Sequence, residues 1–248
     1  MTCRKSGTGR LRRGKAFALG LPPSRLIPTT ARKGGKVLLG HNLDIWHSED
    51  EPRLGAVLAE CWHLLADGAA DPQHDFHLTS LATTHAGLGC TLRTVVLRHV
   101  DAEARELWFY TDLRSRKIGE IQDDPRVALL FHSLSDDTQV RVQAEAVIHH
   151  RDDLADKAWQ ALAPRRRRDY LVSGPRGLPW AWATSGLPSE FESRDPSETE
   201  SEAGRLNFAV AVCHVRQMDW LFLTPYGHRR ANFAWNGQGQ LQTSWLVP

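Results

Sequence analysis

The stretch 93–142 contains R-T-V-V-L-R at residues 93–98, F-Y-T-D-L-R-S-R-K at 109–117, D-D-P-R-V-A-L-L-F-H at 123–132 and Q-V-R-V at 139–142. Each block joins apolar residues typical of a β-strand to a cationic or amide side chain at the strand edge or in the next turn. Guanidinium, ammonium and amide donors in this arrangement suit a phosphorylated, planar ligand that lies across several strands.

The rest of the chain continues this pattern of short strands. Few helical segments interrupt it, and strands and helices do not alternate regularly, so we expect an antiparallel β-barrel with a few helices rather than a doubly wound sheet. Asn236-Gly237 predicts a hairpin turn between the last two strands. The expected strands are His77–Thr84, Arg93–His99, Glu106–Tyr110, Val127–Phe131, Gln139–His149, Leu206–His214, Trp220–Leu223, Arg229–Trp235 and Leu241–Leu246.

Three helices are expected. One begins at Pro52 and ends near Asp67-Gly68, because its apolar residues repeat with a period of about 3.6. The other two are Ser115–Asp123, with Ser115 as the N-cap, and Asp152–Leu162. The segment 164–204 is expected to be irregular, and its Ser-, Glu- and Pro-rich half, 185–204, to be a mobile surface loop.

Charge divides the chain into two parts. Residues 1–43 contain ten Lys or Arg and no Asp or Glu, so of the 31 basic residues 21 remain against 29 acidic ones, a net charge of −8 for the rest. We therefore expect residues 1–47 to be a basic, disordered tail and residues 48–248 to form one domain. A transit peptide is the alternative interpretation of the tail. An acidic body does not suit nucleic acid.

Cysteine and histidine suggest no metal site. Cys3, Cys61, Cys90 and Cys213 are scattered without a C-x-x-C pair, which favours a reducing, cytoplasmic location. The histidines show no spacing typical of metal ligands, so no metal is expected. No apolar run approaches the roughly 18 residues of a membrane-spanning helix.

Several residues of the opening stretch are candidates for a phosphate site. Arg116 and Lys117 lie at the start of a short helix, where free backbone amides also favour an anion. Tyr110-Thr111 ends the preceding strand and can face the same pocket. Arg93 and Arg98 are five residues apart on one strand, so they point to opposite faces unless a bulge or a second subunit intervenes.

The four blocks resemble, in order and spacing, the flavin-binding core of the pyridoxamine 5'-phosphate oxidase family. The resemblance extends from about Pro52 to Pro248 and implies a split β-barrel that binds FMN at a homodimer interface. It implies that Arg93, Thr94, Val95 and Val96 pass along the flavin, and that Gln139 reaches across from the partner subunit. The ribityl phosphate would be held by Tyr110, Thr111, Arg116 and Lys117.

The chain departs from the family where the substrate is expected. Oxidases of this family carry Tyr, Arg and Ser at four-residue steps to hold the vitamin's phosphate, whereas this chain has Tyr170, Gly174 and Leu178. The nearby Arg176 is a candidate substitute, and Arg98 is a candidate anchor for an anionic substrate. The family's R-x-H-x-R pattern corresponds here to a block containing His228, Arg229 and Arg230. We assign His228 and Arg229 to substrate and Arg230 to flavin.

Two functions fit these patterns. The first is an FMN-dependent oxidoreductase that acts as a homodimer on an unidentified small molecule, in a divergent branch of the family, with no catalytic residue assigned. The alternative is a binding protein on the same barrel that holds flavin, haem or a deazaflavin without turnover.

Overall fold

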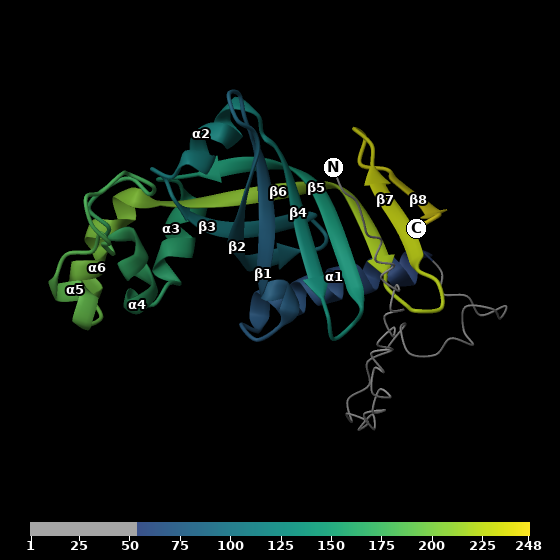
Figure 1. Cartoon of the computed structure of the whole chain (residues 1–248), viewed down its shortest axis with the longest axis horizontal. Helices are drawn as coiled ribbons and strands as arrows, with labels where there is room; N and C mark the ends of the chain where they lie inside the picture. The colour runs from purple at the N-terminus through teal and green to yellow at the C-terminus, as the bar shows by residue number, and fades with distance from the viewer. Residues whose placement is uncertain (1–53) are drawn as a thin grey trace, which may run out of the picture. The chain divides into compact units, whose positions relative to one another are not determined.

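The computed structural model describes residues 54–248, which form an antiparallel β-barrel with additional strands on one side and short helices on the other (Figure 1). The strands follow the order β3-β2-β1-β4-β5-β6-β7-β8, and β3 also pairs with β6, which closes a barrel of six strands. The expected barrel is thus confirmed. The strands are β1 Leu78–His85, β2 Gly89–Asp101, β3 Glu106–Asp112, β4 Arg126–Ser133, β5 Thr138–His149, β6 Phe208–Phe222, β7 Arg229–Trp235 and β8 Leu241–Leu246.

The barrel core follows from the alternation of side chains along each strand. In β4, Val127, Leu129 and Phe131 are buried while the residues between them are exposed. Leu97 on β2 and Phe109 on β3 project into the same core. The inward face of the sheet is therefore apolar, and the alternate residues form a separate outer face.

Strand β6 corrects one expectation, because the two strands expected at Leu206–His214 and Trp220–Leu223 are a single strand of 15 residues. The polar residues Arg216, Gln217 and Asp219 obscured its continuity in the sequence. The first half of β6 pairs with β3 and closes the barrel, and the second half pairs with β7. Most of its length also pairs with β5, with an irregularity between Gln143 and Ala144.

Helix α1, Leu54–Ala70, buries Val57, Cys61 and Leu65 against the barrel and ends one turn beyond the expected Asp67. The 3-10 helix η2, Asp75–His77, lies beside it. A Cβ atom at Gly68 would come within 2.7 Å of Phe76 Cβ, so only glycine allows this close approach. None of the helices in residues 54–248 is long and apolar enough to cross a membrane.

A second apolar cluster supports the helices between β5 and β6. Phe208 packs against Trp159 and Tyr170, at ring centroid distances of 5.3 and 5.0 Å. Asp152 caps the first of these helices by accepting a hydrogen bond from the amide of Ala155. The helices are α3 Asp153–Gln160, α4 Pro164–Arg167, η3 Arg168–Tyr170, α5 Glu190–Ser193, α6 Glu198–Ser201 and η4 Glu202–Asn207.

The segment 185–204 is more regular than expected. It contains α5, α6 and the start of η4, and Ser197 and Glu200 form a reciprocal capping box. Buried Arg167 forms ion pairs with Glu198 and Glu202 at 2.7 Å each. These contacts attach the segment to α4; its mobility stays a prediction. The expected tail, residues 1–47, lies outside the described residues.

Candidate functional site

Positively charged side chains gather where β3 leads into helix α2, Arg116–Asp123. Lys117 Nζ donates hydrogen bonds to Thr111 Oγ1 at 3.0 Å and to Ser115 Oγ at 3.1 Å. Arg93 and Arg176 lie close enough to Lys117 to act on its charge. Ser115 is the N-cap but makes no side-chain capping hydrogen bond, so its hydroxyl remains directed to the cluster. We call Arg93, Thr111, Ser115, Lys117 and Arg176 the cationic cluster.

Lys117 is the member of this cluster that most requires an anion. Burial, together with the charges of Arg93 and Arg176, lowers the pKa of its ammonium to about 8. Lys117 forms no ion pair within residues 54–248, and its partners there are the two hydroxyl groups. A phosphate placed here would gain three cationic donors at once. The cluster therefore has the chemistry of a phosphate site.

Glu120 connects α2 to the barrel wall beneath the cluster. Its Oε2 atom accepts hydrogen bonds from Thr83 at 2.5 Å, from Thr91 at 2.8 Å and from Arg93 Nη2 at 2.8 Å. Burial raises the pKa of this carboxyl, but the hydrogen bonds from these donors outweigh burial and hold the pKa below its usual value. The carboxylate is thus charged at neutral pH and fixes Arg93.

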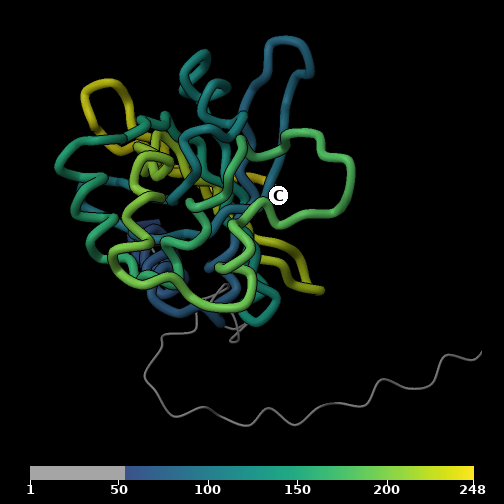
Figure 2. The backbone as a smooth tube through the Cα atoms, turned by 90° about the vertical axis from the view of Figure 1, so that its left-hand side faces the viewer, coloured from purple at the N-terminus to yellow at the C-terminus, as the bar shows by residue number. Residues whose placement is uncertain are grey.

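Asp112 has the same role on the other side of the cluster. This buried carboxylate pairs with Arg114 at 2.7 Å and lies 3.8 Å from Arg176 Nε. Arg114 also donates to the carbonyl of Val172 at 2.9 Å. These contacts fix the beginning of the loop 172–187, which projects widely in Figure 2. Its exposed apolar residues include Leu178, Trp180 and Trp182.

Arg98 lies apart from the cationic cluster. The pairing of β2 with β3 shifts between Leu97 and His99, so Arg98 is the extra residue of a β-bulge. Its guanidinium lies 5.8 Å from the Tyr110 ring centroid, and Tyr170 acts on its charge as well. Burial and the charge of Arg166 lower the pKa of Arg98. The sequence placed Arg93 and Arg98 on opposite faces unless a bulge lay on their strand, and the structure contains such a bulge.

Tyr110 and Thr111 therefore contact different groups. Thr111 contacts Lys117, whereas Tyr110 packs edge-on against Phe208 at 5.2 Å and lies under Arg98. Burial raises the pKa of both Tyr110 and Tyr170, so both phenols are neutral hydrogen-bonding groups. The structure groups Arg98, Tyr110 and Tyr170 as a second polar cluster and does not place Tyr110 with the phosphate-type donors.

Other candidate cofactor residues lie on the outer face of the sheet. Thr94 pairs with Ser80, which pairs in turn with Leu130 and so with Arg141. Gln139 pairs with Leu221, and Leu221 pairs with Arg230. Because alternate residues share a face, the outer face carries Thr94, Val96, Gln139 and Arg230, whereas Arg93 and Val95 point inward. Within one chain these outer-face residues do not join the cationic cluster.

Asp219 holds the two arginines of this outer face. It pairs with Arg141 Nη2 at 2.8 Å and with Arg230 Nη2 at 2.7 Å. A groove runs along the same face beside them, over Ser80, Leu92 and Leu130. Leu92 on β2 is 67% exposed and Leu130 on β4 is 41% exposed, and β1 lies between these two strands. Two such exposed leucines on one face of a sheet form an apolar patch.

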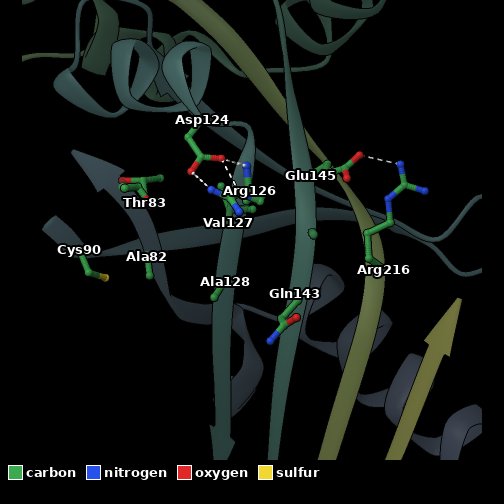
Figure 3. A pocket seen from close by; sticks show the side chains of 12 residues that line it. Ala82, Thr83, Cys90, Asp124, Arg126, Val127, Ala128, Gln143, Glu145 and Arg216 are labelled. Atoms are coloured by element: carbon green, nitrogen blue, oxygen red, sulfur yellow. Dashed lines mark hydrogen bonds and ion pairs between the residues drawn. The ribbon is translucent and has the colours of Figure 1, made fainter. Parts of the chain in front are cut away.

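An adjoining groove continues along β1, β4, β5 and β6 (Figure 3). Its floor carries the small side chains of Ala82 and Ala128. Two ion pairs flank it, Asp124–Arg126 at 2.7 Å and Glu145–Arg216 at 2.6 Å. The outer face thus combines an apolar centre with a charged rim, which is typical of protein–protein interfaces.

The block at the start of β7 lies at the edge of this face. His228 is exposed and accepts a hydrogen bond from the amide of Thr224 at 3.2 Å, and Arg229 donates to the carbonyl of Gly227 at 3.2 Å. Together with Arg230 they line a shallow pocket beside the C-terminal residues Trp245–Pro248. Their assigned contacts with substrate stay predictions.

Ser115 was predicted only as an N-cap, and three acidic residues of the site were not assigned from the sequence. Glu120 and Asp112 were missed because acidic residues do not suggest a phosphate site, although each fixes an arginine. Asp219 was missed because its partners lie on other strands. A search for a carboxylate one turn after the Arg116-Lys117 pair would have found Glu120 alone. Within the described part of the chain no three His, Cys, Asp or Glu side chains gather as metal ligands do.

The closed barrel and the cationic cluster define a class of protein, an antiparallel barrel with cationic and hydroxyl donors gathered at the start of a short helix. A family model described as "Pyridoxamine 5'-phosphate oxidase" matches residues 69–181. The chain belongs to the pyridoxamine 5'-phosphate oxidase-like family.

Relatives named pyridoxine/pyridoxamine 5'-phosphate oxidase support this membership. The protein of Crocosphaera subtropica is 30% identical over 129 residues, which cover 52% of this chain and 53% of the relative. The protein of Anaeromyxobacter dehalogenans is 38% identical over 104 residues, covering 42% and 50%. The matches thus span about half the length of these relatives.

Solved structures share the fold. A pyridoxamine 5'-phosphate oxidase-related, FMN binding protein from Nostoc punctiforme has a TM-score of 0.60 and 21% identity, covering 77% of this chain and 96% of its own. PhzG from Burkholderia lata, solved in complex with tetrahydrophenazine-1-carboxylic acid, has a TM-score of 0.59 and 18% identity, covering 81% and 95%. The expected FMN-type split barrel is confirmed as the fold.

Proposed function

We propose that this protein is an FMN-dependent oxidoreductase that acts as a homodimer. The main observation in favour of FMN as the cofactor is the cationic cluster. Its half-buried Lys117 has hydroxyl partners and no ion pair within residues 54–248. Arg93, Thr111, Ser115, Lys117 and Arg176 would hold the phosphate of FMN, with Arg116 at its open side. When bound, FMN would supply the redox step by accepting hydride at its ring.

The outer face supports the proposed homodimer. Exposed Leu92 and Leu130 lie there beside Thr94 and Val96, while Gln139 and Arg230 lie on the same face farther along the sheet. If two copies pair through this face, the Gln139 and Arg230 side chains of one copy approach the β2 strand of the other. Pairing also covers the apolar centre of the grooves.

The substrate is a small anionic molecule rather than the phosphorylated vitamin of the named relatives. Arg98, with Tyr110 and Tyr170 beside it, is the anchor for the anionic group. Gly174 and Leu178 supply no charged or hydrogen-bonding side chain, and a Cβ at Gly174 would touch Leu178 at 3.4 Å. Arg176, which lies between them, is the remaining charged side chain, and its Nε atom lies 3.8 Å from Asp112 at the cationic cluster. The two replaced positions support a divergent branch of the family.

Reconstitution with FMN tests the cofactor directly. We expect the purified protein to be yellow, or to become so with FMN, and to release the flavin spectrum on denaturation. Bound FMN should also raise the melting temperature, because a ligand that binds only the folded state stabilises it by about 2.7 kcal/mol at 100 times its Kd. Absence of both effects with excess FMN would refute the proposal.

The affinity for FMN is expected to fall as the pH rises above about 8. Below that pH Lys117 is already protonated, so the affinity is fully present; above it, phosphate binding must restore the proton. Each further pH unit then weakens binding by up to about tenfold. Fluorescence-quenching titrations of FMN measure this slope. The Lys117→Arg variant keeps its charge and should show a flat profile over the same range; a parallel slope would point to another titrating group.

A further inference from the structure

The two carboxylate oxygens of Glu120 differ in their hydrogen bonds. Its side chain is 2% exposed, and Oε2 accepts three hydrogen bonds from Thr83, Thr91 and Arg93. Oε1 is equally inaccessible and has no hydrogen-bond partner in residues 54–248. A buried carboxylate oxygen without a donor is costly, so a donor that reaches Oε1 would stabilise this carboxylate.

Arg116 is the donor within reach. It lies one helical turn before Glu120, and its Nε atom is 3.7 Å from Oε1, which is longer than a hydrogen bond. Its side chain is 59% exposed, so it is free to move toward the cluster. A phosphate at the start of α2 would attract the Arg116 guanidinium inward, over the unoccupied oxygen.

Arg93 already makes the hydrogen bond to Glu120 that Arg116 does not make. Its Nη1 and Nη2 atoms donate to Thr83, Thr91 and Glu120, and no protein group in the described part of the chain accepts from its Nε. The guanidinium is thus oriented by Glu120 and keeps a free donor. A carboxylate beside a phosphate site would otherwise only repel the ligand.

We propose that Glu120 is a positioning residue for the phosphate end of the cofactor: it fixes Arg93 through Oε2 and receives Arg116 on Oε1 when the phosphate binds. Glu120 itself touches no ligand. This inference rests on the proposed FMN function, and it adds a residue that acts only through the two arginines.

The isosteric variant Glu120→Gln separates positioning from simple charge. Removing a negative charge near a phosphate should by itself tighten binding, and Asp123→Asn, an exposed carboxylate on the same helix, measures that effect. We expect Glu120→Gln to weaken FMN about tenfold while riboflavin, which lacks the phosphate, changes less than about twofold. The ³¹P NMR signal of bound FMN should also shift in Glu120→Gln and not in Asp123→Asn.

A double-mutant cycle tests the link to Arg116. Arg116→Ala should weaken FMN in the natural chain and have little further effect in the Glu120→Gln background. Additive losses, unchanged or tighter FMN binding by Glu120→Gln, or equal losses for FMN and riboflavin would each overturn the positioning role. If the natural chain binds no FMN, the proposed function itself fails; if it binds FMN and Glu120→Gln binds equally well, only this inference fails.

Discussion

Replacing Arg116 and Lys117 together by alanine is expected to weaken FMN binding by about 100- to 1,000-fold and to change riboflavin binding by less than about threefold. Charge-assisted hydrogen bonds contribute roughly 1.5–3 kcal/mol each, and about 1.4 kcal/mol corresponds to a factor of ten. Lys117 should account for most of the loss, because it is half-buried while Arg116 is 59% exposed and screened by solvent.

Isothermal titration with both ligands measures this difference. The matched control is the double variant Lys157→Ala and Arg165→Ala. It also removes one lysine and one arginine charge, but from exposed positions on α3 and α4. The control should retain FMN affinity within about twofold. If the double Arg116→Ala and Lys117→Ala variant lost equal affinity for FMN and for riboflavin, the cationic cluster would not be the binding site of the phosphate.

Glutamate at both Leu92 and Leu130 is expected to convert the dimer to a monomer and to abolish tight FMN binding at the same time. Both leucines lie on the proposed interface, at 67% and 41% exposure in the single chain. Burying unpaired carboxylates there would cost several kcal/mol, which corresponds to a dimer dissociation constant raised on the order of 1,000-fold. Flavin binding falls with it because Gln139 and Arg230 would no longer be supplied by the second copy.

Sedimentation velocity with flavin absorbance as a second signal measures both effects. Leu134→Glu is the control, since Leu134 is 80% exposed on the turn between β4 and β5 and lines neither groove of the outer face. This control should remain dimeric. A natural chain that is monomeric at every concentration, or a double glutamate variant that still binds FMN, would contradict an interface at this face.

The elements that the sequence predicted best are those with a strong local pattern. The limits of β7 and β8 agree with expectation because the Asn236-Gly237 turn separates the two strands. The continuous strand β6 was divided because its middle is polar, and pairing with β3, β5 and β7 overrides that local signal. In 185–204, Phe191 packing and the Arg167 ion pairs accompany helices that composition did not indicate.

The sequence by itself brought Thr111, Ser115 and Lys117 together, because they lie within one strand–turn–helix unit and meet through local geometry. Only the tertiary structure decided which distant groups join them. Glu120 meets Arg93 of β2 through the packing of α2 on β1 and β5, and Arg176 meets Asp112 through a loop that returns to the end of β3. Strand register also decides two other features. It sets the bulge that directs Arg98 toward Tyr110, and it aligns Gln139 with Arg230 across the sheet through Leu221. Register is fixed by burial of the whole sheet, which no single stretch of sequence contains.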